Sequence, residues 1–247
     1  MDKRGLGLIN PAGWKALSSR NRRRPILVDS LGREQDRLSS GAFSAMSRAT
    51  IEFDADSFLD PLPLFQEWFR LAAEAEPNDP NAMALATATA DARPSVRMVL
   101  MKRVDAAGFA FYTNVESQKG RELLANPFAA LCFHWKSLRR QVRVEGSITE
   151  LSPADADGYF HSRSRLSQIG ALASQQSRPL ASRVQLERRA AELAGQYPAE
   201  IPRPGYWKGF LLRPDRIEFW QDGTHRLHDR ILFTRTGDTW SKTRLYP

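Results

Sequence analysis

The sequence predicts an α+β fold in which a few helices flank an antiparallel β-barrel. From residue 83 onward, short runs rich in β-branched and aromatic residues follow one another, separated by Gly, Pro, Asn and Asp. Helical patterns interrupt these runs at only a few places, which is typical of this fold class. The 247 residues are 42% hydrophobic, enough to form the core of one large domain or two small ones.

The helices are predicted from start signals and apolar spacing. Asp60 and Pro61 form a start signal, and an amphipathic stripe of Leu, Phe and Trp follows them to about Glu76. Ser117 and Ser152 are candidate N-caps for two later helices. The predicted helices cover residues 60–76, 117–125, 153–161, 166–174 and 178–197.

The strands are predicted between clusters of turn residues. Residues 77–81 contain two prolines and end the first helix, Asn126-Pro127 ends the second, and Gly237-Asp238 joins the last two strands. The predicted strands are Met83–Thr89, Ser95–Val104, Phe109–Asn114, Phe128–Trp135, Arg140–Leu151, Gly205–Leu212, Arg216–Gln221, Leu227–Arg235 and Thr239–Tyr246.

The positive charge is concentrated at the N-terminus. The formal net charge is +8, but residues 1–50 hold ten Lys and Arg against four Asp and Glu, which leaves only +2 for the remaining 197 residues. Weak periodicity and the run Arg22–Pro25 predict a basic, mostly disordered arm over residues 1–55. Because the rest of the chain is nearly neutral, we expect no nucleic-acid partner.

Several classes of protein are disfavoured by what the sequence lacks. No apolar run approaches the roughly 20 residues that span a bilayer, and no secretory signal pattern is present. The single cysteine, Cys132, excludes an internal disulfide and is expected to be a buried small side chain. There is no glycine-rich phosphate loop, nucleophile elbow or metal-ligand spacing. We therefore expect a cytoplasmic protein with no membrane contact and no metal.

The segment His225–Arg230 is the most unusual local pattern. If the strand that follows includes it, Arg226, His228 and Arg230 share one face, because alternate strand residues point the same way. Three neighbouring cations repel one another unless water or an anion faces them. The row therefore indicates either a solvated edge strand or a wall that binds an anion such as phosphate.

Further polar segments lie beside predicted strands and helix ends. Arg97 and Lys102 bracket one apolar strand, and their odd spacing requires a bulge or a ligand contacted from two directions, unless they are ordinary strand-end charges. Ser117-Gln118-Lys119 begins a helix, where free N–H groups favour phosphate. Gln141 offers an amide to the edge of a heterocycle, and Gln175–Ser177 is a polar loop.

In this order, these segments resemble the pyridoxine (pyridoxamine) 5'-phosphate oxidase family. The likeness runs from about Asp60 to Pro247 and includes many short motifs. They are Arg97–Lys102, Tyr112–Asn114, Phe133–Trp135, Arg140–Val142, Tyr159–Arg163, Ser167–Ala171, Gln176-Ser177, Ile217–Gln221, Arg226–Arg230 and Arg244–Pro247.

The resemblance implies a split β-barrel oxidase domain over residues 56–247 and a homodimer with FMN at its interface. It implies FMN contacts from Arg97, Met98, Val99, Leu100, Met101, Lys102, Tyr112, Thr113, Gln118, Lys119, Gln141, Gln176, Ser177, Trp220 and Arg230. It implies substrate contacts from Lys102, Tyr159, Arg163, Ser167, Arg226, Leu227 and His228, with Arg226 and His228 as the catalytic residues.

The implied reaction is the oxidation of pyridoxine 5'-phosphate or pyridoxamine 5'-phosphate by O2, giving pyridoxal 5'-phosphate and hydrogen peroxide. The alternatives are a related flavin oxidase acting on another substrate, such as a phenazine precursor, and a non-catalytic flavin- or pyridoxal-phosphate-binding protein. Two departures from the family pattern stand out. Gln118 occupies a position where the family usually has Arg, and residues 1–59 contain no recognisable substrate lid.

Overall fold

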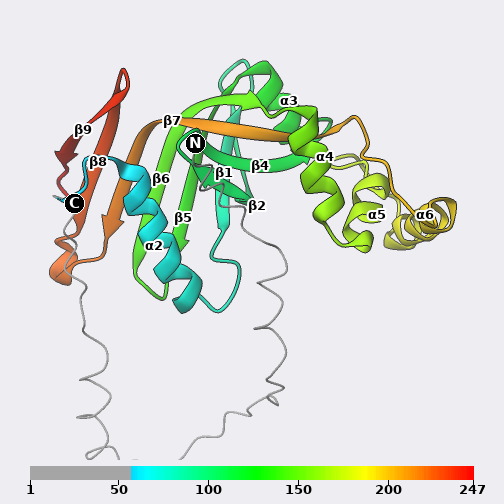
Figure 1. The fold of residues 1–247 in the computed structure, drawn as a ribbon, viewed down its shortest axis with the longest axis horizontal. Coiled ribbons are helices and arrows are strands. Elements are labelled where there is room, and N and C mark those ends of the chain that lie inside the picture. The colour runs from blue at the N-terminus through cyan, green and yellow to red at the C-terminus, as the bar shows by residue number, and fades with distance from the viewer. Residues whose placement is uncertain (1–56) are drawn as a thin grey trace, which may run out of the picture. The chain divides into compact units, whose positions relative to one another are not determined.

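The computed structural model describes residues 57–247, so the arm predicted over residues 1–55 lies outside them (Figure 1). The strands are β1 Ala82–Ala88, β2 Pro94–Leu100, β3 Arg103–Asp105, β4 Gly108–Asn114, β5 Phe128–Trp135, β6 Arg140–Glu150, β7 Trp207–Gln221, β8 Asp229–Thr236 and β9 Thr239–Arg244. The helices are α2 Pro61–Ala75, α3 Gln118–Ala125, α4 Pro153–Ser162, α5 Arg165–Ala173, α6 Arg183–Gln196 and the 3₁₀ turn η3 Thr224–Arg226. The predicted α+β class is confirmed.

The sheet is antiparallel and curls back on itself. Its main path is β2-β1-β5-β6-β7-β4-β3, with β8 and β9 added beside β7. The sequence predicts one strand over residues 95–104, but the structure has two, β2 and β3, interrupted at Met101 and Lys102. There the Met101 N–H donates to the Asn81 carbonyl at 2.9 Å and the Lys102 N–H donates to the Ala110 carbonyl at 2.8 Å. Since β2 pairs with β1 and β3 pairs with β4, the chain closes the barrel at this interruption.

Strand β7 is a single strand of 15 residues, where two separate strands over 205–212 and 216–221 were predicted. It pairs with β6 along its length, with β4 through its first half and with β8 through its second half. Pro214 lies where the β6–β7 register shifts beside Gly146, so its missing N–H does not end the strand. A Cβ on Gly146 would lie 2.0 Å from the Arg213 carbonyl oxygen, so this close approach requires glycine.

Helix α2 covers one end of the barrel core. Asp60 caps it by accepting a hydrogen bond from the Leu62 N–H at 2.9 Å, as the start signal predicts. The fully buried Phe65 ring packs against Phe109 at 4.8 Å and Phe133 at 5.1 Å, and Trp68 contacts Phe219 at 5.2 Å. One helix thereby joins strands β4, β5 and β7 through aromatic contacts.

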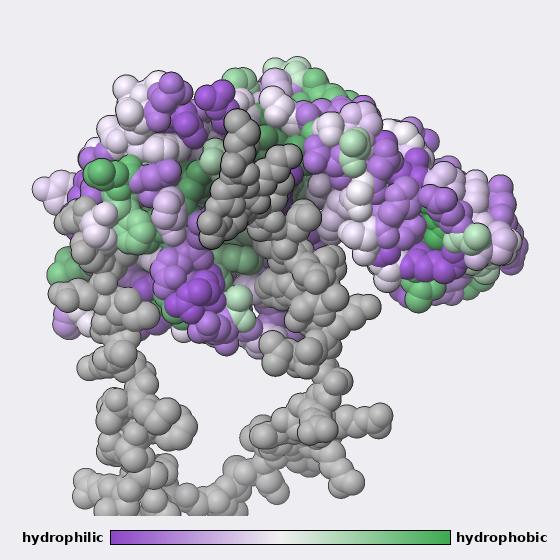
Figure 2. All heavy atoms as spheres, in the orientation of Figure 1, coloured by the Kyte–Doolittle hydropathy of each residue, from purple (hydrophilic) through white to green (hydrophobic). Residues whose placement is uncertain are grey.

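Helices α4, α5 and α6 form a smaller layer beside the barrel. Its core contains Phe160, Ile169, Ile201 and Trp207. Helix α6 has no buried residue, and Figure 2 shows mostly hydrophilic side chains over this part of the molecule. It begins at Arg183 instead of the predicted residue 178, because Ser182 supplies the N-cap.

Two further expectations were tested by the structure. Cys132 is only partly buried, since β5 places it on a less enclosed position than its apolar neighbours suggest. Among residues 57–247, no helix is long and apolar enough to cross a membrane.

Candidate active site

A first group of predicted residues meets around the start of α3, and we call it the α3 cluster: Arg97, Thr113, Gln118, Lys119 and Gln176. The Lys119 ammonium donates to Gln176 Oε1 at 3.0 Å, and the Thr113 hydroxyl reaches the same oxygen at 3.4 Å. Strand β2, strand β4, helix α3 and the loop after α5 thus place their polar side chains together. Burial lowers the pKa of Lys119, and the neighbouring charge of Arg97 lowers it further.

The helix start itself adds donors to this cluster. Ser117 is the N-cap and accepts from the Gly120 N–H at 3.3 Å, while its hydroxyl donates to the Asn114 carbonyl at 2.6 Å. A Cβ on Gly120 would lie 2.4 Å from the Val115 Cα, so only glycine lets the helix begin this close to β4. Cations beside a helix N-terminus suit a phosphate group.

One acidic residue, Glu122, contacts two members of the α3 cluster, Arg97 and Gln118. Its side chain is 5% exposed and accepts hydrogen bonds from Ser95 at 2.6 Å, Thr87 at 2.5 Å and Gln118 at 2.9 Å, with Arg97 at 3.3 Å. Burial alone would raise the pKa of this carboxyl, but the three hydrogen bonds and the Arg97 charge outweigh it and lower the pKa to about 2. Glu122 therefore fixes Arg97 and Gln118 as an ionised carboxylate.

This arrangement predicts how stability depends on pH. Because the carboxyl of Glu122 titrates near 2 in the folded protein and near 4.5 when unfolded, its stabilisation is complete above about pH 5 and is lost as the pH falls toward 2. Glu122→Gln should cost about 1–3 kcal/mol of unfolding free energy at pH 7, because the amide presents a donor to groups that donate. Urea unfolding at fixed protein concentration should show this difference shrinking below pH 4.5. The exposed Glu74→Gln serves as the control, and a difference that is constant with pH would contradict the prediction.

A second group lies at the interface of the barrel with α4 and joins four predicted residues to Trp207. We call it the aromatic cluster: Lys102, Tyr112, Tyr159, Arg163 and Trp207. The rings of Tyr112 and Tyr159 stack at 4.3 Å, and Tyr112 stacks on Trp207 at 5.3 Å. The Lys102 ammonium lies 5.8 Å from the Tyr159 ring, and the Arg163 guanidinium lies 5.2 Å from the Trp207 ring. Two cations are thereby held against one aromatic wall.

Neither of these two cations forms an ion pair in the described residues, and the charge of Asp79 only partly offsets the lowering of the pKa of Lys102. The buried Nη1 of Arg163 has no hydrogen-bond partner there. Burial lowers the pKa of Lys102, the charge of Arg163 lowers it further, and burial raises the pKa of Tyr159 to about 12. A buried donor without an acceptor costs free energy, so the aromatic cluster fits an anionic ligand. Ser167, in the first turn of α5, is exposed, with its Oγ 2.8 Å from that of Ser164.

A third group surrounds the second half of β7. Gln141 on β6 and Arg230 on β8 are the two register neighbours of Trp220. Arg230 donates to Glu218 at 2.9 Å and to the Tyr246 carbonyl at 2.9 Å, and the first of these bonds raises its pKa. The His228 ring lies 4.7 Å from the Trp220 ring. We call this set the Trp220 cluster.

The predicted row of Arg226, His228 and Arg230 on one strand is wrong. Strand β8 begins at Asp229, and Arg226 belongs to the 3₁₀ turn η3. His225 and Arg226 have φ of 55° and 65°, a left-handed conformation that no strand contains. Leu227 is 72% exposed. Only Arg230 of the three cations is therefore on the strand, while Arg226 and His228 are presented by a strained loop.

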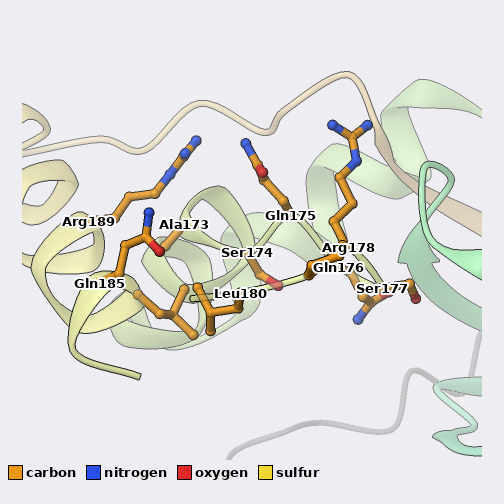
Figure 3. Close-up of a pocket in the computed structure, with 11 residues that line it drawn as sticks. Ala173, Ser174, Gln175, Gln176, Ser177, Arg178, Leu180, Gln185 and Arg189 are labelled. Carbon is orange, nitrogen blue, oxygen red and sulfur yellow. The ribbon is translucent and has the colours of Figure 1, made fainter. Parts of the chain in front are cut away.

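In the loop after α5, the side chains of residues 175–178 point in two directions. Figure 3 shows Gln175 and Arg178 extending to one side of a pocket, while Gln176 and Ser177 turn to the other. Arg178 is paired with Glu116 at 2.9 Å. Gln176 accepts from the Lys119 ammonium at 3.0 Å, and its place among the cofactor-binding residues stays a prediction.

The remaining predicted residues lie along β2 and just after it. Met98 and Leu100 are exposed at 64% and 38%, Val99 is half-buried, and Met101 is fully buried in the core. Successive side chains of a strand point to opposite faces, so exposed and half-buried residues alternate along β2. Because its side chain is enclosed, Met101 can contact a ligand only through its backbone.

Four residues in or beside these clusters were not predicted from the sequence: Glu122, Trp207, Glu218 and Asp222. Glu122 lies four residues after Gln118, a helical spacing that could have indicated their contact. Glu218 and Asp222 carry no comparable signal, because their partners Arg143, Arg230 and His228 come from other segments.

Two solved structures share the fold of this chain. A pyridoxamine 5'-phosphate oxidase-related, FMN binding protein from Nostoc punctiforme PCC 73102 shares the fold at a TM-score of 0.64 and 17% identity, covering 77% of this chain and all of that one. The structure of PhzG from Burkholderia lata 383, in complex with tetrahydrophenazine-1-carboxylic acid, has a TM-score of 0.74 at 34% identity and covers 78% of this chain and 95% of that one. The chain has the split-barrel fold of these proteins, of which the Nostoc protein is described as FMN binding.

The family follows from the sequence matches. Residues 69–197 match the family described as pyridoxamine 5'-phosphate oxidase, and residues 207–247 match the pyridoxine 5'-phosphate oxidase C-terminal dimerisation region. The pyridoxine/pyridoxamine 5'-phosphate oxidase of Gluconobacter oxydans is 60% identical over 189 residues, covering 76% of this chain and 94% of that one. The corresponding protein of Rhodospirillum rubrum is 59% identical over 194 residues and is covered to 96%. The chain belongs to the pyridoxine/pyridoxamine 5'-phosphate oxidase family and is an oxidoreductase.

Proposed function

We propose that this chain oxidises pyridoxine 5'-phosphate and pyridoxamine 5'-phosphate to pyridoxal 5'-phosphate, with FMN as cofactor and O2 as the final electron acceptor. The observation that carries the proposal is the presence of two separate anion-binding groups, the α3 cluster and the aromatic cluster. A cofactor and a substrate that each carry a phosphate group need two such sites, one for each phosphate. The buried, unpartnered Nη1 of Arg163 supports the second of them most directly.

FMN fits the donors that the chain provides. Its phosphate would be held by Arg97, Thr113, Lys119, Gln176 and Ser177, and its ring by β2, Tyr112, Gln141, Trp220 and Arg230. Bound there, FMN would supply the acceptor for a hydride from the substrate, and its reoxidation by O2 would give hydrogen peroxide. Glu122 does not oppose this binding, because four groups of the protein already satisfy its charge.

The substrate would be oriented by its phosphate and by its ring. Lys102, Tyr159, Arg163 and Ser167 would hold the phosphate at the aromatic cluster. Arg226 and Leu227 would lie over the pyridine ring, and His228 would form a hydrogen bond with the substituent on C4'. The alcohol gives the aldehyde directly; the amine gives an imine, and its hydrolysis releases ammonia.

A homodimer explains why the site residues fall into separate groups. Trp207, beside Arg163, and Trp220, beside His228, stand at opposite ends of one strand, 13 residues apart. At about 3.3 Å per residue this is about 40 Å, far more than a small phosphate ester spans. One substrate can contact both groups only if a second subunit supplies one of them. The match to a dimerisation region over residues 207–247 supports this assembly.

Gln118 should weaken FMN binding relative to relatives with Arg at this position. Its amide donates to Glu122 at 2.9 Å and brings no charge to the α3 cluster. Gln118→Arg should tighten FMN binding by about fivefold, since a charge-assisted hydrogen bond exceeds a neutral one by about 1 kcal/mol. Fluorescence titration of the FMN-free protein measures the change, with the exposed Gln185→Arg as control. Equal affinity in the Gln118→Arg variant and the unmodified protein would refute the prediction.

The proposed reaction is tested by flavin absorbance. The purified protein should be yellow, bleach without oxygen on addition of either vitamer phosphate, and recover in air with formation of peroxide and pyridoxal 5'-phosphate. Bleaching only by a phenazine precursor would identify a different oxidase. A protein that binds flavin and is never bleached would be a carrier.

A further inference from the structure

The loop that presents His228 contains a carboxylate that the proposed function does not use. Asp222, just after β7, places Oδ1 3.0 Å from Nδ1 of His228. The Asp222 side chain is 14% exposed and that of His228 is 21% exposed, so water screens the contact weakly. Within the described part of the chain, the other ring nitrogen of His228, Nε2, has no hydrogen-bond partner.

The same Nδ1 has a second, competing neighbour. The Gly223 N–H donates a hydrogen bond to it at 3.2 Å, which suits a ring whose Nδ1 carries the lone pair. The Asp222 carboxylate instead suits a ring whose Nδ1 carries the proton. The Asp222 oxygen lies at ion-pair distance and is charged, and a charged partner attracts a ring proton about twice as strongly as a neutral one, so we expect the carboxylate to decide the tautomer. The neutral ring then has its lone pair on Nε2.

Asp222 is itself held in place from the neighbouring hairpin. The Arg139 guanidinium pairs with its other oxygen, Oδ2, and the Asp222 N–H donates to the Arg139 carbonyl at 3.0 Å. Arg139 has a φ of 54°, in the turn between β5 and β6. The carboxylate is therefore bound at both oxygens and through its backbone, and its orientation does not depend on a ligand.

The loop is closed tightly enough to keep these groups together. A Cβ on Gly223 would lie 1.9 Å from the Leu227 carbonyl oxygen, so only glycine permits this approach. His225 and Arg226 then follow in the left-handed region. Strain of this kind persists only where the surroundings enforce it, and it is frequent at functional sites.

We propose that Asp222 is a positioning residue: it holds the proton of His228 on Nδ1 and thereby makes Nε2 the atom that accepts the hydroxyl proton of the substrate. As the C4'–H bond breaks and its hydride goes to the bound FMN of the proposed function, the C4'–O–H proton would pass to Nε2, and the alcohol would become the aldehyde. The inference rests on the proposed function, because the role of His228 does. It adds the residue that selects the reactive nitrogen.

The test uses the FMN-bound protein labelled with ¹⁵N-histidine. Long-range ¹H–¹⁵N correlation spectra show which ring nitrogen carries the proton, and the signal missing from His228→Asn identifies residue 228 among the four histidines. In the unmodified protein Nδ1 should carry the proton. In Asp222→Asn the proton should move wholly or partly to Nε2, where the Gly223 N–H then supports it.

Turnover supplies the second arm of the test. Asp222→Asn should lower kcat about 10- to 100-fold, as the loss of outer partners of a functional histidine does, and leave the KM within about twofold. Asp222→Glu keeps the charge and should recover part of kcat. Asp215→Asn, an exposed aspartate on β7, is the matched control and should change neither. The flavin absorbance of each variant shows that it is folded and loaded.

Two results would overturn the inference: an unchanged His228 tautomer in Asp222→Asn, or a changed tautomer with unchanged kcat. Failure of the proposed function is distinguishable, because it appears as absence of bleaching in the unmodified protein. The spectra test whether Asp222 sets the tautomer of His228 even if the protein does not oxidise the vitamer phosphates.

Discussion

Arg163→Met is expected to raise the KM for pyridoxine 5'-phosphate about 100-fold and to leave FMN affinity unchanged. The guanidinium is held against Trp207 with a buried Nη1 that no described residue satisfies. Losing a charge-assisted, desolvated contact with a phosphate costs about 3 kcal/mol, which corresponds to that factor. Met keeps the stem that packs on Phe160 and Trp207, so the core of this layer should persist.

The substrate phosphate provides an internal control for this variant. Discrimination between pyridoxine 5'-phosphate and pyridoxine, measured as the ratio of their kcat/KM values, should fall by the same factor. Arg188→Met, on the exposed side of α6, should leave both values unchanged. Retention of the discrimination in Arg163→Met would place the substrate phosphate elsewhere.

Phe65→Ala is expected to destabilise the protein by about 3–5 kcal/mol. The ring is fully buried and contacts Phe109, Phe133 and Trp135, so truncation opens a cavity at the junction of α2 with the barrel. The effect should appear as a lower urea midpoint with an unchanged slope. Because no ligand-binding residue is altered, the protein that remains folded should keep its FMN affinity.

Two conditions make this measurement decisive. The comparison must be made on FMN-free protein at a fixed concentration, since cofactor and subunit association both add apparent stability. Val184→Ala on α6, where the side chain is 61% exposed, should change the midpoint little. A loss below 1 kcal/mol in Phe65→Ala would show that α2 contributes little to the barrel core.

The sequence predicted most elements because local signals and final structure agree there. The caps Asp60, Ser117 and Ser152 each start the helix that was expected of them. Strand β7 was predicted as two strands, 205–212 and 216–221, and the gap between them contains Pro214, which has no N–H for a ladder hydrogen bond. Only the register shift beside Gly146, on another strand, shows why it is tolerated.

The candidate site was predictable by residue type and less so by geometry. Arg226, His228 and Arg230 alternate like strand residues, and nothing local reveals the left-handed turn at residues 225 and 226. That turn depends on the approach of Gly223 to Leu227, which is a property of the closed loop. Asp222 was missed for the same reason, and so were three of the four partners of Glu122: only Gln118, four residues away on α3, is a local contact.

The length of β7 has a genetic consequence. In the proposed dimer each chain is part of two reaction centres, because Arg163 and His228 lie beside opposite ends of that strand. An allele altered at Arg163 and an allele altered at His228 would each be defective alone. Co-expressed in one cell, they would form mixed dimers in which both lesions fall in one centre and the other centre is intact. Two recessive alleles of this gene can therefore complement each other.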